Sequence, residues 1–203
     1  MPFSWDDGVE AYAAQPIRDA AAYEAGLARA RAHLTPDMRV LEMGCGTGMT
    51  ARRLAPSVAQ VTGTDASAAM IDMARRKAAE EGPDNVSFER LALGGPALPG
   101  EPFDAVMAFN LLHLAEDLNA AVADLRSRIR PGGLAITKTA CLGGAWSVLR
   151  PVIGAMRLAG KAPRVLYFTR ARLEGAFRQA GFEVLEAADH PRRPPIRLVI
   201  ARA

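Results

Sequence analysis

The residues from Val40 to Met49 constrain the fold of this chain more than any other stretch. An apolar run ends in an acidic residue, and Gly44, Gly46 and Gly48 then stand at alternate positions before a helical pattern begins. Glycine accepts a left-handed backbone and allows a ligand to approach the main chain closely. A strand that leads through such a turn into a helix is typical of the carboxyl edge of a parallel sheet, where α/β folds bind nucleotides. We therefore expect an α/β fold with a ligand site at this turn.

The spacing of the glycines separates the classes of nucleotide site. A dinucleotide fingerprint has the order G-x-G-x-x-G, and its last glycine would fall at position 49, where this chain has Met49. The turn also lacks the lysine of a phosphate-binding loop. The chain instead has Glu-x-Gly-x-Gly-x-Gly, starting at Glu42.

Apolar runs and helical patterns alternate four times, which predicts a parallel sheet with right-handed crossovers. We expect a Rossmann-like doubly wound sheet, mostly parallel with an antiparallel C-terminal strand and with helices on both faces. The predicted strands are 38–43, 58–64, 86–91, 103–109, 134–139, 182–187 and 196–201, and the predicted helices are 17–34, 47–54, 67–81, 117–129 and 170–180. A turn is expected at 130–133, and a proline-rich link at 190–195 joins the last two strands.

Length and composition favour a single domain with a core of its own. The chain has 203 residues, and half of them are hydrophobic. We expect an N-terminal segment, about residues 1–35, and a cap-like insertion at about 140–168. No signal peptide and no membrane-spanning run is recognised, and the two cysteines, Cys45 and Cys141, fit a reducing compartment. The expected location is cytoplasmic.

The charge is unevenly distributed along the chain. Residues 1–125 carry 10 basic and 18 acidic side chains, whereas residues 126–203 carry 15 basic and 4 acidic ones. A basic surface for an acidic substrate, a lipid headgroup or nucleic acid is one interpretation. A solvated arginine-rich surface is favoured, because arginine outnumbers lysine 22 to 3 throughout. Nucleic acid is not an expected partner, since no aromatic residues interleave these arginines.

Five further pieces follow the glycine turn in an order that is typical of one family. They are Val-Thr-Gly-Thr-Asp-Ala-Ser at 61–67, Pro-Phe-Asp-Ala-Val at 102–106, Asn-Leu-Leu-His-Leu at 110–114, Arg-Pro-Gly-Gly at 130–133 and Ala-Gly-Phe-Glu-Val at 180–184. Together with the turn, they resemble the class I S-adenosylmethionine-dependent methyltransferases. The resemblance covers residues 36–140 firmly and 169–203 loosely.

The resemblance implies S-adenosyl-L-methionine as the cofactor and assigns roles around it. Asp65, 21 residues after Gly44, would accept hydrogen bonds from the ribose hydroxyls, although a helix N-cap is the other interpretation. Glu42 would help to hold the ammonium group, and a charge at the end of an apolar strand needs a partner in any case. Gly44, Gly46 and Gly48 would make room for the methionine portion, and Cys45, within the turn, is also expected to bind the cofactor.

The resemblance implies fewer contacts for the adenine part of the cofactor. Ala66 and Met70 resemble the apolar residues that pack around adenine, although plain core packing suits Met70 as well. Many relatives place an acid shortly after the third strand, and this chain has none there. Ala92 would then contribute a backbone contact only.

The fourth strand and the N-terminal segment complete the implied site. Phe109 and Asn110 end that strand, close to where relatives hold the transferable methyl group; a loop-capping role is equally consistent for Asn110. Tyr12 resembles a residue of the segment that folds over the cofactor in small relatives. Its alternative role is an aromatic anchor for that segment.

Methyl transfer needs a general base only if the acceptor must lose a proton near the transition state. His113, three residues beyond Asn110, is the candidate base, and a structural histidine is the alternative. No Cys and His cluster has metal-ligand spacing, so no metal is expected. The predicted activity is methyl transfer to a small-molecule acceptor. The alternative is a catalytically weak S-adenosylmethionine-binding protein that acts through interaction.

The segment 140–168 is expected to select the acceptor. It combines apolar residues such as Trp146 and Ile153 with basic residues such as Arg150 and Arg157, which suits an apolar or anionic small molecule. Contact with a membrane surface is a second interpretation. Packing of a cap helix onto the domain core is the favoured one. The accepting atom and the oligomeric state are not predicted.

Overall fold

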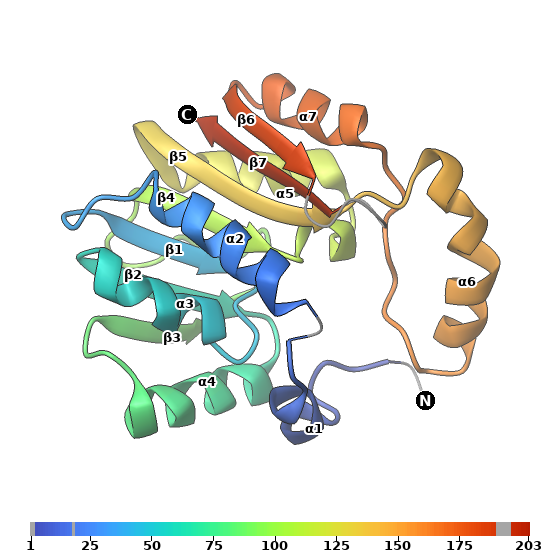
Figure 1. Ribbon diagram of the computed structural model, residues 1–203, viewed down its shortest axis with the longest axis horizontal. Helices are drawn as coiled ribbons and strands as arrows, with labels where there is room; N and C mark the ends of the chain where they lie inside the picture. Colours follow the sequence, from blue (N-terminus) through green and yellow to red (C-terminus); the bar gives the residue numbers. More distant parts are fainter. Residues whose placement is uncertain (1–2, 18, 190–195) are drawn as a thin grey trace.

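The computed structural model describes residues 3–17, 19–189 and 196–203 and shows a sheet of seven strands in the order β3-β2-β1-β4-β5-β7-β6 (Figure 1). Only β7 runs antiparallel to its neighbours, β5 and β6. The mostly parallel, Rossmann-like sheet with an antiparallel C-terminal strand is therefore confirmed. The strands are β1 Arg39–Met43, β2 Gln60–Asp65, β3 Val86–Arg90, β4 Phe103–Phe109, β5 Ile129–Ala140, β6 Glu183–Asp189 and β7 Ile196–Arg202.

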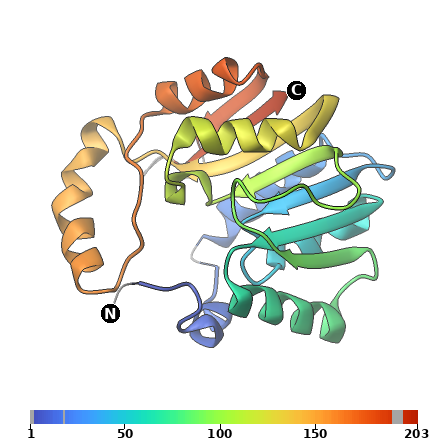
Figure 2. The same ribbon diagram turned by 180° about the vertical axis from the view of Figure 1, so that it is seen from behind.

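Helices cover both faces of the sheet, as an apolar parallel sheet requires (Figures 1 and 2). Alternate residues of β4 point to opposite faces, so Val106 and Ala108 join one core and Ala105 and Met107 join the other. The first core packs against α5 Leu118–Ser127 and α7 Arg170–Gln179. The second packs against α2 Ala20–Arg31, α3 Met49–Leu54 and α4 Ala68–Glu81.

The strand order reverses between β1 and β4, whose paired residues include Leu41 and Val106. Ligands of open α/β sheets bind beyond the carboxyl ends of the strands at such a switch point. The chain adds two irregular parts to the alternating core. One is the N-terminal segment with α1 Val9–Ala14, and the other is the excursion after β5 with the 3₁₀ helix η3 Gly144–Leu149 and α6 Arg150–Leu158.

The excursion after β5 closes on itself at its base. The amide of Gly143 donates to the carbonyl of Phe168 at 2.9 Å, so the segment leaves and rejoins the body at one place. Its helix α6 contributes no buried residue and stands apart from the sheet in both views (Figures 1 and 2). The expectation that a cap helix packs onto the domain core is therefore wrong.

Three other expectations need correction. The helix predicted from residue 17 begins at Ala20, because the side chain of Asp19 caps it by accepting from the Ala22 amide at 2.9 Å. Helix α1 was not predicted. The predicted turn at 130–133 lies within β5, where Gly132 and Gly133 exchange backbone hydrogen bonds of 2.9 Å with the C-terminal Ala203. The proline-rich link at 190–195 lies outside the described residues.

Candidate cofactor and acceptor site

The glycine turn joins β1 to α3, and its three glycines serve different purposes. All three have positive φ, at 68° for Gly44, 53° for Gly46 and 73° for Gly48. A Cβ on Gly44 would lie 2.7 Å from the Leu111 side chain, and one on Gly48 would lie 2.5 Å from Phe88. Neighbouring side chains therefore leave no room for a side chain at either position. A Cβ on Gly46 would meet nothing within 4 Å. The main chain at Gly46 is therefore the open part of the turn.

Asp65 ties the tip of β2 to this turn. One carboxylate oxygen accepts from the Gly46 amide at 3.0 Å, and the other accepts from the Ser67 amide at 2.9 Å. Burial raises the pKa of Asp65, and these two amides act in the opposite direction. Each oxygen keeps a lone pair for a further donor. The carboxylate is therefore held in one orientation with spare acceptor capacity, and it does not serve as the α4 cap. Ser67 fills that role by accepting from the Met70 amide at 3.1 Å.

Glu42, on β1, is buried beneath the turn with an exposed fraction of 2%. Burial raises its pKa to about 8, although the Ala51 amide and the Thr50 hydroxyl both favour the charged form. The Oε2 atom of Glu42 has no hydrogen-bond partner among the described residues. The hydroxyl of Tyr23, from α2, lies 3.2 Å from the Thr50 hydroxyl and completes the polar surroundings. An unpaired buried carboxylate oxygen calls for a donor or a cation.

The N-terminal segment is anchored across the start of α4. Asp6 accepts from the Ser67 hydroxyl at 2.6 Å and from the Ala69 amide at 3.2 Å. Farther along, Glu10 pairs with Arg76 at 2.6 Å. Because Ser67 follows Asp65 by two residues, these contacts bring the segment next to the carboxylate at the tip of β2.

Tyr12 belongs to this segment and is half-exposed. Burial, and then the nearby negative charge of Asp65, raises the pKa of its phenol. The ring also packs edge to face against Trp5, with centroids 6.4 Å apart. The contact with Trp5 agrees with the anchoring role considered for Tyr12, and the contact of Tyr12 with a cofactor stays a prediction.

The end of β4 contains the only described non-glycine residue with positive φ, Asn110 at 56°. Its amide donates to the Lys138 carbonyl at 2.6 Å, and its side chain is exposed. Left-handed residues other than glycine are concentrated at functional sites. Phe109, the last residue of β4, is buried and belongs to the second core.

His113 lies in the 3₁₀ helix η2 Leu112–Leu114, next to the end of β5. Its Nδ1 atom is 3.1 Å from the Thr139 hydroxyl oxygen, which also accepts from the His113 amide at 3.2 Å. Its carbonyl accepts from the Leu166 amide at 2.7 Å, which links the histidine to the excursion after β5. Burial lowers the pKa of His113 to about 4, so the ring is neutral at physiological pH.

Of the other predicted site residues, Cys45 and Met70 are buried, whereas Ala66 and Ala92 are exposed. The Cys45 side chain is buried in the core, and its amide donates to the Thr64 carbonyl at 2.9 Å, which leaves only its backbone at the turn. Met70 is buried with Val9 of α1, in agreement with the core-packing alternative. Ala66 and Ala92 are both exposed beyond the ends of β2 and β3, so they lie at the same edge without a buried contact.

Sequence reasoning missed the partners that surround the predicted residues. Tyr23 and Thr50 line the Glu42 environment, Asp6 anchors the N-terminal segment, and Thr139 holds His113. Because a buried Glu42 needs a hydrogen-bond partner, the sequence could have pointed to Thr50, which lies in the helix directly after the turn. The other three contacts join distant segments, so no local pattern marks them.

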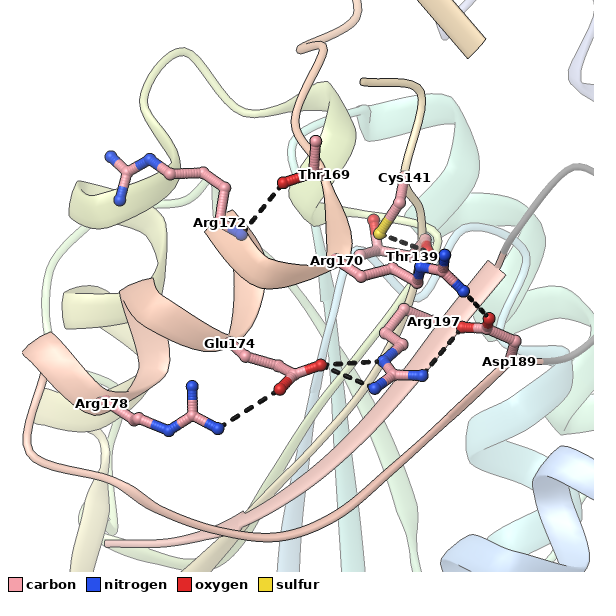
Figure 3. A network of polar contacts seen from close by, with 9 residues as sticks. All are labelled: Thr139, Cys141, Thr169, Arg170, Arg172, Glu174, Arg178, Asp189 and Arg197. Atoms are coloured by element: carbon pink, nitrogen blue, oxygen red, sulfur yellow. Dashed lines mark hydrogen bonds and ion pairs between the residues drawn. The ribbon is translucent and has the colours of Figure 1, made fainter. Parts of the chain in front are cut away.

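A separate cavity of about 210 Å³ lies past the end of β5 and is lined by Cys141, Trp146, Thr169, Arg170 and the Gly143–Ala145 stretch. None of these residues belongs to the glycine turn. Beside it, a network of ion pairs and hydrogen bonds holds α7 to β6 and β7 (Figure 3). Arg197 is the centre of this network, because it pairs with both Glu174 and Asp189. Among the described residues, no group of His, Cys, Asp and Glu side chains is arranged to hold a metal ion.

Comparison with known proteins identifies the family of this domain. A model of the methyltransferase domain matches residues 40–133. This part of the chain belongs to the class I S-adenosylmethionine-dependent methyltransferase family. A ubiquinone biosynthesis O-methyltransferase from Methylobacterium nodulans is 30% identical over 155 residues, which cover 73% of this chain and 61% of that relative. The matches span 24–61% of the length of the first five curated relatives.

Solved structures share the fold at low sequence identity. An S-adenosylmethionine-dependent methyltransferase from Mesorhizobium loti aligns with a TM-score of 0.74 at 24% identity and covers 91% of this chain and 99% of that one. A cyclase, SpnF, aligns with a TM-score of 0.75 at 20% identity and covers 93% and 83% of the two chains. This class I methyltransferase fold therefore also supports a reaction other than methyl transfer.

The cofactor of this methyltransferase family is S-adenosyl-L-methionine, and the residues present fit it at three points. The main chain is open at Gly46, Asp65 has spare acceptor capacity at the tip of the next strand, and Glu42 has an unpaired buried oxygen. An ammonium group, vicinal hydroxyls and a close backbone contact would match these three features.

Proposed function

We propose that this protein transfers a methyl group from S-adenosylmethionine to a small-molecule acceptor. The unpaired Oε2 atom of Glu42, buried next to an open glycine turn, is the observation that carries the proposal. A ligand with an ammonium group would give this oxygen the partner that the described residues do not supply. The sulfonium of the bound cofactor supplies an electrophilic methyl group, so the protein contributes mainly binding and orientation.

In this proposal, each polar group binds one part of the cofactor. Asp65 accepts hydrogen bonds from the two ribose hydroxyls, while the Gly46 amide keeps the carboxylate in place. Tyr12 covers this part of the site, because Asp6 and Glu10 fasten its segment to α4. Asn110, held in a left-handed conformation at the end of β4, borders the transferable methyl group.

His113 is the proposed proton acceptor. Its ring is neutral at physiological pH and can accept a proton, and its pKa of about 4 makes it a weak base. The Thr139 hydroxyl, 3.1 Å from Nδ1, fixes the plane of the ring and leaves Nε2 as the nitrogen available to an acceptor. The His113 carbonyl accepts from the Leu166 amide, which joins the backbone of this residue to the excursion after β5.

The proposed acceptor is a small molecule with a hydroxyl or amino group. The relative from Methylobacterium nodulans is named as an O-methyltransferase, which favours a hydroxyl group. The cavity past the end of β5 is lined by Trp146 and Arg170, so an apolar or anionic acceptor suits it best.

Calorimetric titration tests the cofactor, and a labelled-methyl screen tests the reaction. We expect binding of S-adenosylmethionine and S-adenosylhomocysteine and no binding of a nicotinamide dinucleotide. The screen then presents phenols, amines, carboxylates and lipids. Cofactor binding without methyl transfer to any of these would favour the alternative, a binding protein that acts through interaction. Binding of the dinucleotide alone would contradict the proposed function.

A further inference from the structure

The helix α6 and the 3₁₀ helix before it present apolar side chains that nothing in the described chain covers. Val148, Val152 and Met156 follow one another at intervals of four residues, so they lie on one face of the helix. Their exposed fractions are 73%, 59% and 44%, and that of Leu158 is 92%. Four of the seven exposed large hydrophobic side chains of the described residues are therefore gathered in these two adjoining helices.

The same segment carries positive charge that is not neutralised. Arg150, Arg157, Lys161 and Arg164 are all exposed, and no ion pair joins any of them to a described residue. The stretch 140–169 contains no acidic residue that could serve as a partner. We call these four basic residues and the four exposed apolar ones the α6 patch.

The arginines of the neighbouring α7 and β7 show the contrast. Arg170, Arg178 and Arg197 pair with acidic side chains of their own region (Figure 3). In the α6 patch, Arg150 instead lies over the ring of Tyr167, with 4.6 Å between the guanidinium carbon and the ring centroid. Outside the α6 patch, six of the described basic residues after position 125 form ion pairs with acidic side chains, namely Arg128, Arg130, Arg170, Arg178, Arg197 and Arg202, whereas no basic residue of the patch does.

A partner for this patch must cover an apolar stripe and also supply negative charge. A dimer in which this patch faces the same patch of a second copy would bring like charges together, and nucleic acid would leave the apolar stripe uncovered. An anionic lipid surface meets both needs, because its phosphates face the basic side chains and its acyl boundary takes up the apolar ones. The helix has 9 residues, too few for a bilayer, and no described helix is long and apolar enough to cross one.

We propose that the α6 patch docks this protein onto the surface of an anionic lipid bilayer. The helix lies in the plane of the interface, with Val148, Val152 and Met156 in the acyl boundary. Arg157, Lys161 and Arg164 reach the headgroup phosphates. Docking of this kind requires neither the cofactor nor methyl transfer, so it is independent of the proposed reaction.

Vesicle co-sedimentation tests the docking directly. The probes are vesicles of equimolar phosphatidylglycerol and phosphatidylcholine, compared with vesicles of phosphatidylcholine alone. We expect the protein to bind the anionic vesicles, to bind the neutral ones far less, and to dissociate as salt is added. No binding of the parent protein to the anionic vesicles would overturn the proposal.

Two double variants assign the binding to the patch. Arg157→Gln with Lys161→Gln should lower the partition coefficient by about 30-fold, at roughly fivefold for each charge removed. Val152→Ser with Met156→Ser should lower it by at least about tenfold, since two apolar side chains no longer enter the bilayer. All four side chains are exposed, so thermal unfolding should match the parent protein.

Matched changes elsewhere serve as controls. Arg172→Gln with Arg178→Gln removes the same charge from α7, and Leu185→Ser removes an exposed apolar side chain from β6. Both controls should keep vesicle binding. Equal losses in the controls, or none in the patch variants, would contradict the proposal. The proposal would also be contradicted if the parent protein formed a dimer through the patch and did not bind vesicles. It would be contradicted as well if the patch variants bound vesicles normally but had a raised KM for the acceptor.

Discussion

Glu42 shows how one buried side chain narrows the choice of ligand. Its carboxyl group is enclosed by β1, α2 and α3, where water cannot stabilise the charged form. The Thr50 hydroxyl and the Ala51 amide offset part of this cost, and one oxygen remains unpaired. A purely structural role would be served better by an apolar residue at this position. Retention of the carboxyl group is therefore best understood as preparation for a cationic part of a ligand.

The raised pKa of Glu42 predicts a specific pH dependence of stability. Between the ordinary pKa of 4.5 and the folded value of about 8, the folded state holds a proton that the unfolded state has lost. The contribution of Glu42 to the free energy of unfolding is therefore fully present below pH 4.5. It falls by about 1.4 kcal/mol per pH unit as the pH rises toward about 8. Urea unfolding of Glu42→Gln should lack this decline, and the variant should be more stable than the parent protein at pH 8.

A matched control for this experiment is Glu24→Gln. Glu24 is exposed on α2 and pairs with Arg53, so its replacement should leave the decline unchanged. If Glu42→Gln and the parent protein showed the same pH dependence, the carboxyl group would not be buried in its neutral form.

Asp65 should be the largest single polar contribution to cofactor binding. Replacing it with alanine removes the acceptor of two ribose hydroxyls and also frees the Gly46 amide. We expect Asp65→Ala to weaken binding of S-adenosylhomocysteine by about 1–3 kcal/mol in calorimetric titration. Asp72→Ala, an exposed carboxylate on α4, should leave the affinity unchanged. An unaltered affinity in Asp65→Ala would reject the ribose assignment.

His113 should affect the rate of the reaction without affecting cofactor affinity. If its Nε2 atom accepts a proton from the acceptor, His113→Gln should lower kcat by roughly 10²–10⁴-fold. Because burial holds its pKa at about 4, the neutral form is present throughout pH 6–8, and His113 should cause no inflection of kcat in that range. His33→Gln, at the end of α2, is the matched control. An unchanged kcat in His113→Gln would leave the residue a structural role only.

At the scale of elements, the sequence predicted the parts whose contacts are local. Strands β1 to β4 lie within a residue or two of their predicted bounds, because apolar runs, glycine turns and the Ser67 cap are all readable in short windows. The Glu-x-Gly-x-Gly-x-Gly pattern likewise marked the turn and the two acids beside it. These features depend on neighbours along the chain.

The elements that were missed depend on distant contacts. Helix α1 has only six residues and is stabilised by packing of Val9 on Met70 and by the pair of Glu10 with Arg76. The start of β5 is stabilised by backbone hydrogen bonds with Ala203, which lies about 70 residues further along the sequence. A cap helix was expected to cover the core because its composition is apolar, and composition alone does not indicate which face a helix presents.

The contacts of Asp6 should hold the N-terminal segment in place over the proposed cofactor site. Asp6→Ala removes the acceptor for the Ser67 hydroxyl and the Ala69 amide, so the segment should open more often. We expect faster amide exchange in residues 9–14 and a faster release of S-adenosylhomocysteine, measured by hydrogen exchange and stopped-flow displacement. Asp7→Ala, one residue away and exposed, is the matched control. Unchanged exchange in Asp6→Ala would show that this anchor does not hold the segment.

At the scale of the whole molecule, the candidate site joins parts that are far apart in sequence. The turn after β1, the tip of β2 and the N-terminal segment meet through Asp65, Ser67 and Asp6. An unfolded chain cannot assemble these groups, so the cofactor should bind the folded state alone. Binding should therefore stabilise the entire domain and not only the segment it touches.

Thermal unfolding with S-adenosylhomocysteine measures this coupling. At a concentration 100 times its Kd, the ligand should add about 2.7 kcal/mol of stability. For a domain of this size that corresponds to a rise in Tm of about 5–10 °C. At the same concentration, Asp65→Ala should show a much smaller rise, because the site is less occupied, whereas Asp72→Ala should match the parent protein. A rise of equal size in Asp65→Ala would place the ligand elsewhere on the molecule, and an equal rise with a nicotinamide dinucleotide would mean that the glycine turn does not select its ligand.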